Sequence, residues 1–261
     1  AGTVAEGDAL KALAALTGQL HRATDLLHAE APQMRYLSMN AHLMQPPLPV
    51  SESAQTMLGY VSLGAPPDSI GAAKQRVEHA LAGYVPESDR ASVREAVLNM
   101  PLTLSYPLTP ALSLQCLGGN GDYLLDIQRA AMRHDTASVH EHLQAIARLR
   151  SLGRPGELSI YLTYQEAWLL LEVGDTANAT RQLDGSLTAL PALGPYVLDY
   201  VQDAAFLVRA MMLRSDLAAK AGDHKTAQRW AAAVSELWTD ADAPLQGEVA
   251  RMRVRAAGGV R

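Results

Sequence analysis

The chain contains few of the residues that define several common classes of protein. Its 261 residues include one cysteine, Cys116, so no disulfide forms within the chain. We interpret Cys116 as a small buried apolar residue rather than a nucleophile. Since a single thiol is compatible with reducing and oxidising compartments, it does not fix the redox environment.

Long apolar runs are also missing. A membrane-spanning helix needs roughly 18 consecutive apolar residues, and the longest candidate, residues 204–213, is interrupted by Arg209. The formal net charge is −5, and the basic residues are scattered apart from a modest cluster at residues 251–255. We therefore expect a soluble domain with no nucleic-acid partner and no direct membrane insertion.

The chain begins Ala1-Gly2-Thr3 without a methionine. This start predicts a processed protein or an excised part of a longer one. The compartment stays open, because the cytoplasm, the periplasm and release from a membrane-anchored or secreted parent all fit the composition.

Motifs for catalysis are lacking as well. The glycine-dense segment at residues 118–122 is not followed by the Lys-Ser/Thr of a phosphate-binding loop, so we interpret it as a loop between helices. Glu236, Asp240 and Asp242 are interpreted as a solvated group in which one aspartate caps the final helix. We expect no catalytic residue and no cofactor, and therefore no enzyme within this chain.

The histidines offer two weaker possibilities. His21, Asp25 and His28 have a spacing that places them on one helix face, where they could bind a metal, although a solvated face is the commoner arrangement. His140 and His142 point to different sides of a helix and cannot chelate one ion together. With His134 they could form a polar patch that responds to pH.

Alanine and leucine are abundant, which favours helix, and one short phrase recurs. In each copy, the first residue is expected to take the left-handed conformation that ends one helix. The Asp or Thr that follows is expected to cap the N-terminus of the next helix. The three copies are His134-Asp135-Thr136-Ala137, Gly174-Asp175-Thr176-Ala177, and Gly222-Asp223 with Thr226-Ala227.

When the three turns are aligned, apolar residues recur with the period of a helix and form a stripe along one helix face. Small residues stand where two helices would cross. A weaker fourth copy begins at Gly18, and Pro191 is expected to end its helix. The stripe positions lie five, nine and twelve residues after each turn: Val139, Ala179 and Ala227; Leu143, Leu183 and Ala231; Ile146, Ser186 and Val234.

These positions resemble the second half of a tetratricopeptide repeat. The turn residues 134, 174 and 222 are 40 and 48 residues apart, whereas the standard repeat has about 34. The first helices lack the family's Trp-x-x-Leu-Gly-x-x-Tyr run. The resemblance implies an all-α fold of antiparallel helix pairs, a degenerate α-solenoid superhelix.

Residues 230–245 resemble the final repeat of bacterial serine/threonine kinases that carry a C-terminal tetratricopeptide region. The shared phrase is Leu237-Trp238-Thr239-Asp240-Ala241-Asp242. No kinase signature is present in the chain. The resemblance implies a sensor or scaffold part of a bacterial signalling protein.

Prolines divide the chain into two parts. We expect residues 1–110 to form an irregular helical region with one degenerate repeat, and residues 111–261 to form the repeats with a capping helix at 245–257. Residues 101–110, with three prolines, are interpreted as an extended linker. In the first part, helices are expected at about 5–16, 19–30, 52–63, 68–83 and 88–99.

The expected binding site follows from the resemblance, because the first helices of such repeats line a concave face. Counting back from Gly174 and Gly222 gives six partner-binding candidates, whose types are common at interfaces, although aromatic residues in such a helix more often belong to the core. We expect a peptide or partner helix to bind there. Self-association as a scaffold, including a homo-oligomer, and small-molecule or metal binding remain alternatives. The candidates are Tyr161, Tyr164, Trp168, Arg209, Met212 and Asp216.

Overall fold

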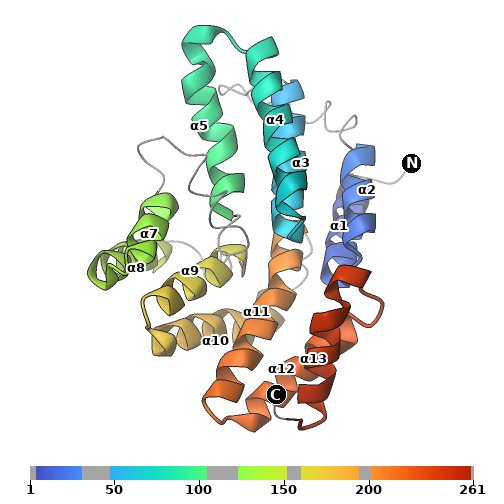
Figure 1. The fold of residues 1–261 in the computed structure, drawn as a ribbon, viewed down its shortest axis with the longest axis vertical. Coiled ribbons are helices and arrows are strands. Elements are labelled where there is room, and N and C mark those ends of the chain that lie inside the picture. The colour runs from blue at the N-terminus through green and yellow to red at the C-terminus, as the bar shows by residue number, and fades with distance from the viewer. Residues whose placement is uncertain (1–3, 31–47, 105–122, 152–159, 194–200, 260–261) are drawn as a thin grey trace. The chain divides into compact units, whose positions relative to one another are not determined.

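The computed structural model describes residues 4–30, 48–104, 123–151, 160–193 and 201–259 (Figure 1). Every regular element in these ranges is a helix, which confirms the all-α prediction. Cys116 and the glycine-dense segment at 118–122 lie outside them. Within the described ranges, no helix is both long enough and apolar enough to cross a membrane.

The chain forms two compact units. Unit 1 combines Ala1–Ala23 with Ala130–Arg261, and unit 2 is Thr24–Arg129. Two helices, α2 (Leu20–Glu30) and α7 (Tyr123–Met132), contain the points at which the chain passes from one unit to the other.

Unit 2 contains α3 (Leu48–Leu63), α4 (Pro67–Tyr84) and α5 (Glu87–Leu104). Their apolar faces form a core that includes Met57, Val77 and Leu98. Two expectations need correction here. The helix expected at about 52–63 begins earlier, at Leu48, with Pro49 in its first turn, where a missing N–H costs little. Helix α5 continues through Pro101 to Leu104 instead of giving way to an extended linker at 101.

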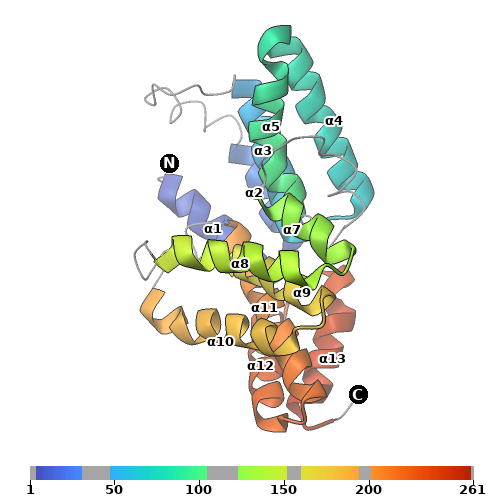
Figure 2. The ribbon, with the colours of Figure 1, turned by 90° about the vertical axis from the view of Figure 1, so that its left-hand side faces the viewer.

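Unit 1 carries the candidate site. In Figure 2 its helices α8 and α10 lie one above the other. The elements are α1 (Val4–Leu16), α8 (Thr136–Ser151), α9 (Ile160–Glu172), α10 (Thr176–Leu193), α11 (Val201–Lys220), α12 (His224–Leu237), η4 (Ala243–Leu245) and α13 (Gln246–Ala256).

The recurring phrase has the geometry that the sequence predicts. His134, Gly174 and Gly222 have φ values of 55°, 81° and 77°, and Gly18 joins them at 74°. After Gly174, the Asp175 N–H donates to the Leu170 carbonyl at 2.8 Å, which closes the end of α9. The same bonding pattern recurs at the other three turns.

The aspartate of each phrase caps the next helix. Asp175 Oδ1 accepts from the Asn178 N–H at 3.0 Å, and Asp135 and Asp223 accept in the same way from the residue three positions on. The side chains of Val139, Ala179 and Ala227 are buried, as the stripe predicts. One expectation is wrong, because α10 continues past Pro191 to Leu193 at the loss of one helical hydrogen bond.

The chain's first helix packs against its last ones. Helix α1 contacts α11, and the Asp242 N–H donates to the Gly18 carbonyl at 3.0 Å. The Asp242 carboxylate accepts from the His21 N–H at 2.8 Å, in the first turn of α2. Asp242 therefore binds the first turn of α2 and does not cap the final helix. The N-cap residue of α13 is Leu245, which makes no side-chain hydrogen bond there.

The predicted capping helix corresponds to α13. Val249 and Met252 have no exposed surface, as expected for the residues that cover the end of the unit. The Arg255 side chain is only 11% exposed, because it binds the Asp216 carboxylate on α11. The local sequence around α13 does not indicate this ion pair.

Candidate binding surface

The contact between α9 and α11 is centred on two aromatic rings. The Tyr164 and Phe206 rings have centroids 5.3 Å apart and an interplanar angle of 41°. Phe206 has no exposed surface and Tyr164 has 6%. Burial raises the pKa of the Tyr164 phenol, because the ionised form loses its hydration. Tyr164 therefore anchors the packing of two helices and presents almost no surface.

Arg209 lies on the α11 side of the same contact. Its guanidinium carbon is 5.5 Å from the Phe206 ring centroid, and Nη1 donates to the Ala205 carbonyl at 3.1 Å. Burial lowers the pKa of Arg209, but an arginine side chain stays protonated in proteins. The site thus has a fixed positive charge beside an aromatic pair.

Two polar groups on α9 are buried without hydrogen bonds. Neither the amide nitrogen nor the amide oxygen of Gln165 has a partner. The indole nitrogen of Trp168 lies near the Tyr164 hydroxyl but makes no hydrogen bond of normal geometry. Their neighbours on the same helix are satisfied, since Thr163 bonds with Ser186 at 3.0 Å and Glu166 accepts from Gln182. A buried polar group that stays without a partner costs about 1–3 kcal/mol, so these atoms favour any partner that can reach them.

Ion pairs connect α11 to α13. Asp216 accepts from both Arg251 and Arg255, and Arg255 Nη1 also approaches Ser215 Oγ at 3.2 Å. Arg251 Nε donates in turn to Glu248 at 2.7 Å. These bonds make α13 a direct neighbour of the predicted site.

We use the name α9–α11–α13 face for Trp168, Arg209, Met212, Asp216 and Arg251. All five are partly exposed. On α11, residues 209, 212 and 216 follow the three-and-four spacing of one helix side. The face therefore crosses three helices that are far apart in sequence.

The six sequence-predicted residues divide into three groups. Tyr161 lies in α9, but its side chain is outside the described part. Tyr164 is buried, and Trp168, Arg209, Met212 and Asp216 belong to the face. That these residues bind a partner stays a prediction. Sequence reasoning missed Gln165, Phe206 and Arg251, since a single amide, ring or cation carries no local signal of its partner.

Histidines link successive turns of unit 1. Of the metal candidates His21, Asp25 and His28, the side chain of His28 lies outside the described part. His140 Nε2 lies 2.5 Å from Asp175 Oδ2, and His134 Nδ1 lies 3.2 Å from the Glu172 carbonyl. The hydrogen bond to Asp175 raises the pKa of His140, and the same bond lowers the pKa of Asp175 to about 2. At the N-terminal end, His21 pairs with Asp242 at 2.5 Å. Among the described residues, no group of three or more His, Cys, Asp or Glu could hold a metal ion.

No protein-family model, no curated protein and no solved structure matches this chain. Its likeness to tetratricopeptide repeats therefore rests on the motifs of the sequence, and a functional argument has to rest on the geometry above.

Proposed function

We propose that this chain is a non-catalytic, tetratricopeptide-like interaction module that binds a peptide or partner helix along the α9–α11–α13 face. The recurring turns support the repeat interpretation. The turns at His134, Gly174 and Gly222 each pair a left-handed exit residue with an aspartate that caps the next helix, as turns within successive helix pairs would require.

The observation that carries the proposal is the set of unpaired polar atoms on α9. Buried polar groups in folded proteins nearly always have partners, so the Gln165 amide and the Trp168 indole N–H mark where the helices do not satisfy their own hydrogen bonds. A peptide backbone supplies both a donor and an acceptor. It would pair with these groups if the partly exposed Trp168 side chain moved aside to admit it.

The surrounding residues suit such a partner. Met212 offers flexible apolar surface, and Met, Trp and Arg are enriched at the centres of protein interfaces. Arg209 provides a charge that would favour a carboxylate on the partner. By the resemblance of residues 230–245, we place the module in a bacterial signalling protein, as its sensor or scaffold part.

Self-association has one observation in its favour. Leu10 and Leu13, one turn apart on α1, are 46% and 49% exposed. Light scattering at two protein concentrations tests this alternative. A dimer that is lost in the Leu10→Gln, Leu13→Gln variant would support a scaffold role through α1.

The proposal is tested by selecting peptides from a random displayed library against the purified chain. Selected peptides should bind wild type and lose at least about tenfold in affinity against Trp168→Ala and against Arg209→Gln. The matched control is Met132→Ala, an exposed apolar residue on α7 that is 45% exposed and outside the face. Unchanged affinity in both face variants, with circular dichroism showing folded protein, would reject the face as the binding site.

A further inference from the structure

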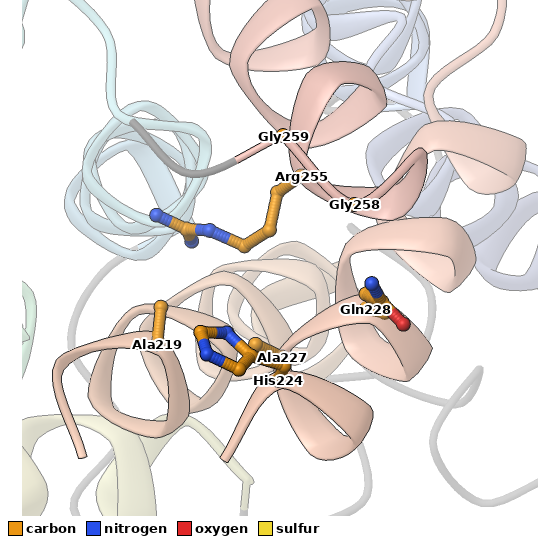
Figure 3. Close-up of a pocket in the computed structure, with 7 residues that line it drawn as sticks. All are labelled: Ala219, His224, Ala227, Gln228, Arg255, Gly258 and Gly259. Atoms are coloured by element: carbon orange, nitrogen blue, oxygen red, sulfur yellow. The ribbon is translucent and has the colours of Figure 1, made fainter. Parts of the chain in front are cut away.

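A second candidate site lies at the opposite end of α11 from Phe206. A cavity of about 300 Å³ opens between the last turn of α11, the first turns of α12 and the end of α13 (Figure 3). Ala219 and Ala227 give it an apolar wall, and His224, Gln228 and Arg255 contribute polar side chains. Its volume is at the lower end of the range for small-molecule sites, so it fits a small ligand.

The polar side chains supply hydrogen-bond donors that the chain itself does not use. His224 and Gln228 are four residues apart on one side of α12, and neither side chain makes a hydrogen bond within the described part of the protein. Arg255 bonds to Ser215 and Asp216 through Nη1 alone. Its Nε and Nη2 donors therefore stay available, although the side chain is only 11% exposed.

The charges around the cavity favour an anion of low charge. No carboxylate is among the described residues that line it, which argues against a cation. Among the described lining residues, Arg255 alone has a permanent charge, and it shares that charge with Asp216. This single, shared positive charge suits a ligand of charge −1 better than a phosphate dianion.

The glycines at the end of α13 keep the cavity open. A Cβ on Gly258 would lie 3.2 Å from Gln228 Nε2, closer than ordinary contact. Gly258 also has φ +86°, which a residue with a side chain rarely adopts. The residue that ends α13 thus leaves room beside the Gln228 amide.

We propose that this cavity binds the carboxylate of a small monocarboxylic acid. The Nε–Nη2 edge of Arg255 is a planar pair of donors that matches the two oxygens of a carboxylate. The Gln228 amide and the His224 imidazole donate from α12, and the ligand's carbon chain packs against Ala219 and Ala227. The cavity lining includes no residue of the α9–α11–α13 face, but Arg255 pairs with Asp216 of that face. The Ala219→Leu and Gln228→Ala variants below therefore test the cavity apart from peptide binding.

The test is a titration of the full chain with sodium butyrate at constant ionic strength, followed by ¹⁵N NMR. We expect saturable shifts of the Gln228 side-chain amide, the Arg255 Nε–H and the Gly258 and Gly259 amides. Butyramide, the neutral isostere, and inorganic phosphate should bind at least about tenfold more weakly. Shifts that never saturate, or tighter binding of phosphate, would overturn the proposal.

Variants separate the cavity from general ion effects. Ala219→Leu fills the cavity and should abolish the saturable shifts, while Gln228→Ala should weaken binding by about fivefold through the loss of one hydrogen bond. Arg253→Ala, an exposed arginine on the same helix, is the matched control and should bind butyrate as wild type does. Equal butyrate binding by wild type and Ala219→Leu, with unchanged melting temperatures, would rule the cavity out.

Discussion

The Trp238 indole nitrogen donates a hydrogen bond of 3.1 Å to the Leu16 carbonyl, 222 residues earlier in the chain. Beside this bond, a Cβ added to Gly18 would lie 2.7 Å from the Ala241 Cβ. The N-terminal helix is therefore fitted closely to the connection between α12 and α13. It belongs to the same compact unit as the repeats, although more than a hundred residues separate them.

This close fit predicts unequal effects at two glycines. Gly18 and Gly174 both have positive φ, but an added Cβ meets three side chains at Gly18 and nothing within 4 Å at Gly174. Gly18→Ala should therefore lower the free energy of unfolding by clearly more than Gly174→Ala does. Urea denaturation of both variants gives the comparison, and equal losses would contradict the packing of α1 on the α12–α13 connection.

Alanine substitutions at Gly174 and Gly185 are expected to change the free energy of unfolding in opposite directions. Gly174→Ala forces a left-handed alanine and should cost about 1–2 kcal/mol. Gly185 lies inside α10 with open space around it, so Gly185→Ala should stabilise the protein by about 0.5–1 kcal/mol. Thermal unfolding of both variants tests this, and a stabilising Gly174→Ala would show that the turn is not left-handed.

The His140–Asp175 pair predicts a dependence of stability on pH. Because the folded-state pKa of His140 is raised, its contribution is complete below its unfolded value of about 6.5 and is lost as pH rises through the folded value. Because the pKa of Asp175 is lowered to about 2, its contribution is present above about pH 4 and is lost toward pH 2.

The pair should therefore stabilise unit 1 most between about pH 4 and 6.5. The difference in melting temperature between wild type and His140→Gln should be largest near pH 5 and should shrink at alkaline pH. His142→Gln, a partly exposed histidine on the same helix, serves as the control. A His140→Gln difference that does not vary with pH would show that the pair does not form.

The core of the α9–α11 contact predicts a large effect at one aromatic residue. Phe206 has no exposed surface, so Phe206→Ala should cost about 3–5 kcal/mol. Val254→Ala, at a residue that is 47% exposed on α13, should change stability by less than about 0.5 kcal/mol. Guanidinium denaturation measures both, and similar losses would place Phe206 outside the core.

Local sequence signals predicted the turns and several helix ends well. The phrase at Gly174 and Asp175 contains its own exit and cap, so its geometry depends little on the rest of the chain. By contrast, Pro101 and Pro191 lie within helices, although each proline removes one helical hydrogen bond. The sequence around them gives no signal that the helix continues. The packing of α1 on α11 depends on contacts across the chain, which no short motif encodes.

The α9–α11–α13 face could likewise be predicted from the sequence only in part. Helical spacing indicated that Arg209, Met212 and Asp216 share one side of α11, and the structure describes them there. The bonds from Asp216 to Arg251 and Arg255 depend on how α13 packs, so the sequence could not indicate them. The unpaired Gln165 amide is likewise a property of its surroundings rather than of the residue type.

Paramagnetic NMR with a spin-labelled selected peptide tests the binding face most directly. The account predicts strong broadening of the Trp168 indole N–H and the Met212 methyl signals, with the exposed Ala232 on α12 unaffected. Broadening centred on Ala232, with the Trp168 and Met212 signals unchanged, would contradict it.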